Sequence, residues 1–175
     1  MEPGQKQKQI IGRHAQVAFL DNDTRSVPAK VDTGADSSSV WASELSIDEQ
    51  GRLHFVLFAR GSRYYTGKKI TKEHYRVKVV RSSNGHEQVR YSVKLRVNIE
   101  ERRFLATFTL ADRSQNIFPV LIGTRLLRNK FVVDVSKGVI RDEQKVRSNQ
   151  LTDLARRDPQ EFFRQYYMTQ DTKEL

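Results

Sequence analysis

The run from Val89 to Ile99 alternates apolar and polar residues, and it constrains the fold more than any other feature of the chain. Its apolar members stand at every second position: Val89, Tyr91, Val93, Leu95, Val97 and Ile99. A period of two is typical of a strand with one face in water. A second strand-like run, 76–81, precedes it, and Asn84-Gly85 lies between the two. Because Asn-Gly is the strongest short signal for a tight turn, we expect a long β-hairpin with its tip there.

Further strand-like runs predict a mainly β domain. They cover 10–20, 25–31, 53–58 and 102–110, and a turn at 21–23 joins the first two. The polar stretch 44–52 is expected to be a turn, and the Gly-, Tyr- and Lys-rich stretch 59–72 a loop.

The C-terminal part of the chain is predicted to be helical instead of β. Asp158-Pro159-Gln160-Glu161 has an N-cap residue, a proline at the first helical position and a glutamate placed for a capping box. The predicted helix carries Phe162, Phe163, Tyr166 and Tyr167 at helical spacing, and a shorter helix is expected near 151–156. These aromatic residues are expected to pack onto the domain or onto a second copy of the chain; a docking helix for another protein is the alternative. We therefore predict a disordered leader (1–9), a β domain (10–140) and a helical C-terminal extension (141–175).

Composition excludes several kinds of site. The 175 residues include no cysteine, so neither disulfides nor thiolate metal sites are expected. The first nine residues are polar, and no apolar run follows that would act as a signal peptide or membrane span. A cytoplasmic protein without membrane association is the expectation.

Positive charge is concentrated in one part of the chain. The net charge is +10, and residues 60–103, with thirteen Lys and Arg against four Glu, carry +9 of it. This stretch is either a solvated sheet face with basic edges or a surface for an acidic partner. No RNA-binding signature accompanies it, so an acidic peptide fits better than nucleic acid.

The segment around Asp32-Thr33-Gly34 suggests a catalytic carboxylate. Val27 to Val31 is apolar apart from Lys30, and it leads into Asp32-Thr33-Gly34, after which small hydroxyl residues and Val40 follow. Gly34 allows a tight fold beneath the carboxylate, and the Thr33 hydroxyl can stiffen the loop by donating to the backbone. Aspartic peptidases hold a catalytic carboxylate in this way, although Asp-Thr-Gly is also ordinary turn chemistry.

Aspartic catalysis needs two carboxylates that share a proton. The chain has one Asp-Thr-Gly, and no glycine follows Asp134, which is therefore interpreted as a strand-end residue. A two-fold homodimer would bring Asp32 against its own copy.

The order of these features resembles the retropepsin fold: Asp32-Thr33-Gly34-Ala35, a glycine-tipped hairpin, Leu121-Ile122-Gly123 and then Leu126-Leu127. A bacterial retropepsin-like family labelled "ATP-dependent zinc protease" (RimB-like) is closer still. The similarity spans roughly residues 11–137 and rests on the segments 11–13, 29–35, 81–86, 109–113, 121–123 and 131–134.

This resemblance implies a retropepsin-like (acid protease) closed barrel with a short C-terminal helical tail, and an aspartic endopeptidase active as a homodimer. The catalytic residues would be Asp32, Thr33 and Gly34; the substrate-binding residues Ala35, Asp36, Arg81, Asn84, Gly85 and His86; and the support of the catalytic loop Leu121, Ile122 and Gly123. Some family members are encoded beside an ATP-grasp ligase that adds glutamates to a ribosomal protein. The resemblance therefore implies poly-glutamate tails as substrate, with the ligase or a ribosomal protein as partner.

Two points depart from the family's pattern and its label. Thr124 stands where the family has an arginine directly after the glycine, so whether Arg125 pairs with Asp36 is left open. The zinc of the label has no support, because His14, His54, His74 and His86 are scattered without a His-Glu-X-X-His pair. No metal and no cofactor are expected. His86 and Glu87 either touch substrate or stand in a solvated turn.

A second function from another class stays open. The same dimeric fold could hold acidic peptides, or dock a ligase or ribosomal partner, while cleaving little peptide. Intact motifs do not distinguish the two hypotheses.

Overall fold

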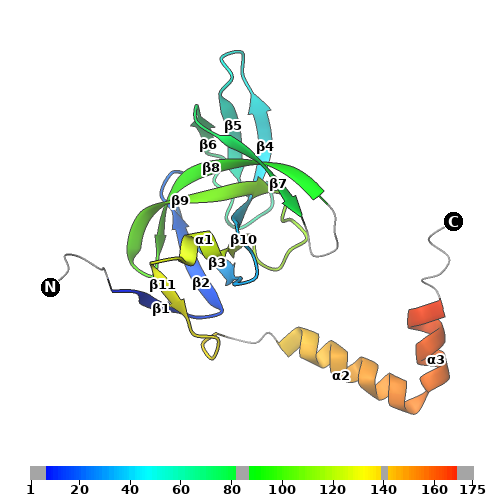
Figure 1. Cartoon of the computed structure of the whole chain (residues 1–175). Coiled ribbons are helices and arrows are strands. Elements are labelled where there is room, and N and C mark those ends of the chain that lie inside the picture. Colours follow the sequence, from blue (N-terminus) through cyan, green and yellow to red (C-terminus); the bar gives the residue numbers. More distant parts are fainter. Residues whose placement is uncertain (1–6, 82–86, 139–141, 169–175) are drawn as a thin grey trace. The chain divides into compact units, whose positions relative to one another are not determined.

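The computed structural model describes residues 7–81, 87–138 and 142–168. The chain divides into two compact units, 1–138 and 139–175. The first is almost entirely β, and the second is helical (Figure 1).

Six strands of the first unit close into a barrel, which confirms the predicted retropepsin-like β architecture. They are β2 (His14–Phe19), β3 (Thr24–Val31), β4 (Ser38–Ile47), β8 (Glu87–Ile99), β9 (Arg102–Ala111) and β10 (Val120–Ile122). The short β10 closes the barrel because it pairs with β3 on one side and β4 on the other. Around the barrel lie β1 (Gln9–Ile11), β5 (Leu53–Leu57), β6 (Lys69–Lys72), β7 (Arg76–Arg81), β11 (Phe131–Val133) and the short helix α1 (Thr124–Leu127).

The alternation in β8 sets which side chains enter the core. Leu95, Val97 and Ile99 are fully buried, whereas Val89 lies beyond the barrel and is 73% exposed. Phe19 and Phe108 pack edge to face with ring centroids 5.5 Å apart, which favours one arrangement of the aromatic core. The hairpin of β7 and β8 forms as predicted, with Val79 opposite Val89. Its expected tip, Asn84-Gly85, lies outside the described residues.

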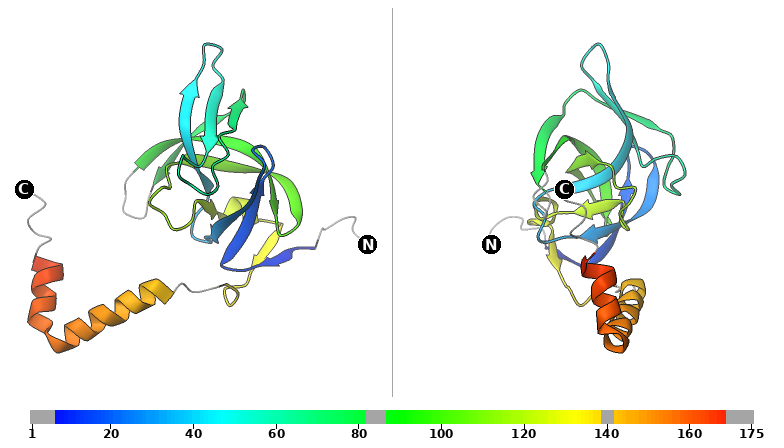
Figure 2. Two further views of the ribbon diagram at one scale, coloured as in Figure 1. Left: turned by 180° about the vertical axis from the view of Figure 1, so that it is seen from behind. Right: turned by 90° about the vertical axis from the view of Figure 1, so that its right-hand side faces the viewer.

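Two expectations about loops were wrong. The stretch predicted as a turn at 44–52 is strand up to Ile47, because β4 and β5 continue beyond the barrel as a projecting hairpin (Figures 1 and 2). The stretch predicted as a loop at 59–72 ends in β6, which pairs with β5. Exposed strands at a sheet edge need no apolar alternation, so their sequence carries little strand signal.

The second unit contains α2 (Asp142–Arg157), α3 (Pro159–Phe163) and the π-helical segment η1 (Arg164–Met168). The predicted cap is confirmed: the Asp158 carboxylate accepts a hydrogen bond from the Glu161 N–H at 2.9 Å. The first helix is longer than expected. The aromatic rings contact one another, with Phe163 and Tyr167 stacked at 5.5 Å; their packing onto the β domain or a second chain stays a prediction. Within the described residues, no helix is long and apolar enough to cross a membrane.

Candidate active site

The predicted catalytic loop begins where β3 ends. Because β3 and β10 are parallel, their carboxyl ends reach the same edge of the barrel, and the Asp32 N–H donates to the Ile122 carbonyl at 2.9 Å. The Gly34 N–H donates to the Asp32 carboxylate at 3.0 Å. Backbone hydrogen bonds therefore hold both the main chain and the side chain of Asp32, whose carboxylate is half-buried.

The segment after β10, Gly123 and Thr124, holds the Asp32 loop in place through hydrogen bonds. The Gly123 N–H donates to the Ser38 hydroxyl at 3.0 Å, and the Thr124 N–H donates to the Ala35 carbonyl at 2.8 Å. A Cβ at Gly123 would lie 2.7 Å from backbone atoms of Ala35 and Ser37, so only glycine fits. Leu121, Ile122 and Gly123 thus lie where the resemblance expects a brace for the catalytic loop.

Gly34 has a different role from the one its position suggests. Its φ is not in the left-handed region, and an added Cβ would meet only the Asp32 carboxylate at 3.4 Å, an ordinary contact. Its N–H donor, which any non-proline residue supplies, is the feature that holds Asp32.

The other predicted site residues fall into three places. Thr33 and Asp36 are exposed and Ala35 is half-buried on the loop itself. Arg81 is at the far end of β7, paired with Glu87 at 2.5 Å. The remaining three, Asn84, Gly85 and His86, lie outside the described residues.

The open question about Arg125 is answered by its position in α1. Its N–H donates to the Asp36 carbonyl at 3.2 Å, and its guanidinium lies 3.6 Å from the Asp36 carboxylate. Both side chains are more than two-thirds exposed, so the pair contributes little to stability. Arg125 nevertheless reaches the aspartate although it stands one residue later than the family's arginine.

Three cations lie near the loop, and two of them, Lys78 and Arg90, belong to the basic stretch 60–103 that was interpreted as a solvated face or a surface for an acidic partner. The Lys78 ammonium donates to the Ser37 hydroxyl at 3.1 Å. Arg113 donates to the Phe118 carbonyl and the Ser39 hydroxyl, both at 3.0 Å. Arg90 stands opposite Lys78 on the hairpin. The segment 109–113 carried the resemblance, but only closure of the barrel brings Arg113 beside the loop.

The carboxylates of Asp32 and Asp36 compensate the positive charge of these cations only in part. Burial lowers the pKa of Arg113, and the positive charge of Arg90 lowers it further, while Asp32 acts in the opposite sense. Burial also lowers the pKa of Lys78, and the charge of Arg125 adds to this effect. Among the described residues, neither Arg90 nor Arg113 forms an ion pair with a carboxylate. The surroundings of Asp32 therefore favour an incoming anion.

The part of the chain that the structure describes contains no cluster of metal ligands. Nowhere among them do three or more His, Cys, Asp or Glu side chains gather as metal ligands would. His54 lies instead against Asp48 at 2.8 Å on the projecting hairpin.

The chain is similar to two proteins of low identity. It is 20% identical over 130 residues to a protein of Desulfotalea psychrophila named "Probable alpha-L-glutamate ligase"; the match covers 73% of this chain and only 28% of that protein. A solved structure from Legionella pneumophila, protein Lpg0085 of unknown function (DUF785), shares the fold with a TM-score of 0.58 and 21% identity over 75% of this chain and 96% of that one.

The family model described as "Retropepsin-like aspartic endopeptidase RimB" matches residues 10–144, which include the whole β barrel, the Asp32 loop and its brace. This match confirms the resemblance inferred from the sequence, and the chain belongs to the RimB-like family of retropepsin-like aspartic endopeptidases.

Proposed function

We propose that the protein is an aspartic endopeptidase whose active site forms between two copies of the chain, each supplying Asp32. The observation that carries this proposal is the half-buried Asp32 carboxylate, which Gly34 holds in the loop that Gly123 braces. A single carboxylate cannot serve as both base and acid in one step, so a second Asp32 is required.

In this mechanism one Asp32 carboxylate takes a proton from a water molecule, and the water oxygen attacks the peptide carbonyl carbon. The protonated Asp32 of the second copy donates its proton to the carbonyl oxygen. The first Asp32, now protonated, then gives its proton to the amine nitrogen as the C–N bond breaks, and the second Asp32 takes a proton back from a hydroxyl group of the tetrahedral intermediate as the carboxyl product forms. The described hydrogen bonds serve to hold the two carboxylates in place.

Exposed groups beside the loop support a two-fold interface. The exposed Thr33 lines a hollow together with two residues of β11, the buried Phe131 and the half-buried Val133. In the two-stranded sheet of β1 and β11, Ile10 pairs with Val132, and these side chains are 57% and 52% exposed. An exposed apolar pair on a small sheet that pairs with no other described strand is a surface that a second copy would cover.

The substrate we propose is an acidic peptide, with glutamate-rich protein tails as the specific form. Lys78, Arg90 and Arg113 around the loop support it, as does the net charge of +9 in residues 60–103. The similarity to a protein named as a glutamate ligase points the same way. A glutamate ligase or a glutamate-tailed ribosomal protein would then be the partner, in the cytoplasm.

The same cations favour one alternative, a module that binds acidic peptides and cleaves little. Asp32→Asn separates the two functions because it removes the base but preserves the size of the side chain and its hydrogen bond. We expect the variant to lose cleavage of a glutamate-rich peptide and to retain binding. Peptide cleavage unchanged in Asp32→Asn would refute the peptidase proposal, whereas binding with no cleavage by either form would favour the alternative. Cleavage should also be blocked by aspartic-peptidase transition-state mimics and persist in chelator.

A further inference from the structure

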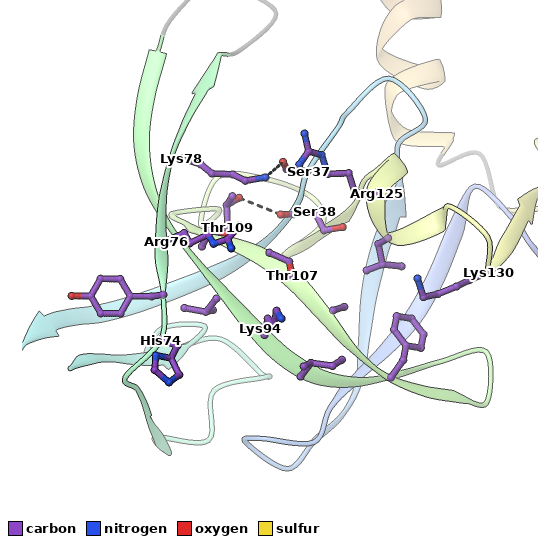
Figure 3. Close-up of a pocket in the computed structure, with 17 residues that line it drawn as sticks. Ser37, Ser38, His74, Arg76, Lys78, Lys94, Thr107, Thr109, Arg125 and Lys130 are labelled. Atoms are coloured by element: carbon purple, nitrogen blue, oxygen red, sulfur yellow. Dashed lines mark hydrogen bonds between the residues drawn. The ribbon is translucent and has the colours of Figure 1, made fainter. Parts of the chain in front are cut away.

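A cavity of about 590 Å³ lies between the β7–β8 hairpin, β9 and α1, on the side of the Ser37 segment (Figure 3). Its wall combines hydroxyl groups, among them Ser37 and Thr107, with apolar side chains such as Phe104 and Leu126. This volume is typical of a cavity that binds a ligand.

The charged residues of the wall are all basic. They are Arg76, Lys78, Lys94, Arg125 and Lys130, which we call the basic cavity cations, and none of the described residues that line the cavity is an aspartate or glutamate. In the described part of the chain, only Arg125 of these five has a carboxylate within 4 Å. Besides burial, the positive charges of Arg125 and Arg76 lower the pKa of Lys78, so these cations repel one another, and a bound anion would reduce that repulsion.

The cavity begins at the catalytic loop. Lys78 crosses from β7 to donate to Ser37, five residues after Asp32, and Figure 3 shows Lys78 and Arg125 converging on that serine. Arg125 also contacts Asp36. An extended peptide that leaves the Asp32 loop past Asp36 and Ser37 would therefore reach the basic cavity cations directly.

We propose that this cavity is a second binding site, separate from the point of cleavage, for the carboxylate side chains of an acidic substrate segment. The inference rests on the proposed function. It assigns to Arg76, Lys94 and Lys130, which line the cavity but lie outside the loop, the role of binding substrate carboxylates.

The test measures binding by fluorescence anisotropy in the Asp32→Asn background, where the peptide stays intact. The probes are a glutamate-rich peptide and the matched glutamine-rich peptide. The cavity variant is Arg76→Gln/Lys94→Gln, two exposed residues of the cavity wall. The control is Arg103→Gln/Lys69→Gln, two exposed strand residues that do not line the cavity, so both variants lose the same net charge.

We expect the cavity variant to bind the glutamate-rich peptide about fivefold to tenfold more weakly, since each exposed charge pair contributes only modestly. Its affinity should also vary less with salt. The control should change affinity by less than about twofold, and neither variant should alter binding of the glutamine-rich peptide. Equal losses of affinity in the cavity variant and the control would mean that only net charge matters, and would overturn the proposal. An unchanged affinity in the cavity variant would overturn it as well.

Calorimetry with inorganic phosphate separates substrate carboxylates from a free anion. Phosphate binding that the cavity variant abolishes, together with unchanged affinity for the glutamate-rich peptide, would assign the cavity to a free anion and contradict the proposal. Cleavage assays on chains with Asp32 intact keep the two proposals distinct. A protein that cleaves no peptide refutes the peptidase, while the binding data still decide the cavity.

Discussion

Replacing Gly123 by alanine should damage the site without touching Asp32. The new methyl carbon would lie 2.7 Å from the carbonyl oxygens of Ala35 and Ser37 and from the carbonyl carbon of Ser37. Comfortable contact needs about 3.4 Å or more, so the two loops must separate by about 0.7 Å. All three atoms belong to backbone, and no rotamer change can relieve the contact.

The loss of stability in Gly123→Ala can be estimated from this contact. Forcing an extra methyl group into a filled site costs about 1–3 kcal/mol, so we expect a loss of about 2 kcal/mol in the free energy of unfolding. For a chain of this size, that corresponds to a fall of about 4–8 °C in Tm. Because a shift of 1 Å can cost about a hundredfold in rate, cleavage should fall by about tenfold.

Gly34→Ala is the matched control. Its methyl group would meet only the Asp32 carboxylate at 3.4 Å, so its free energy of unfolding should change by less than about 0.5 kcal/mol. Urea denaturation of both variants checks the comparison. A Gly123→Ala protein as stable as Gly34→Ala would refute the claim that the glycine braces the loop.

Two further predictions concern the hairpin and the dimer. Although partial burial acts to raise the pKa of Asp48, hydrogen bonds from His54 and Arg52 hold it well below its usual range. The stability that ionised Asp48 provides should therefore be present above about pH 4 and be lost as the pH falls further. The Tm difference between the wild type and Asp48→Asn should accordingly become smaller in acid. A Tm difference that does not depend on pH would contradict this prediction. Replacing Ile10 and Val132 by aspartate should convert a dimer into folded monomers in analytical ultracentrifugation and abolish cleavage, and an active, dimeric variant would exclude the β1–β11 surface as the interface.

The sequence predicts the parts of the fold whose residues alternate. The β7–β8 hairpin follows from the apolar run that ends at Ile99. In contrast, β6 (Lys69–Lys72) has only Ile70 in the core, so a strand pattern is absent from its sequence. The loop and its brace were predicted because Asp32 and Gly123 lie in recognisable motifs.

The positions of the cations around the site could not be predicted, although the sequence indicated the basic stretch 60–103 and raised a pairing of Arg125 with Asp36. Lys78, Arg113 and Arg125 come from a hairpin, a strand end and a helix far apart in the chain, and only barrel closure gathers them. Whether Arg125 pairs with Asp36 stayed open in the sequence for a similar reason. Arg125 stands one residue later than the family's arginine, but it lies in the first turn of α1, where its backbone N–H donates to the Asp36 carbonyl, so its side chain still reaches Asp36.

Mixing subunits shows whether one active site needs Asp32 from two chains. Wild type and Asp32→Asn are mixed in equal amounts, left to exchange, and assayed on a glutamate-rich peptide. If both aspartates are required, random pairing leaves only the wild-type pairs active, and the rate per total chain falls to about one quarter of the pure wild-type rate. A rate of about one half would mean that each chain works alone, and would contradict the account.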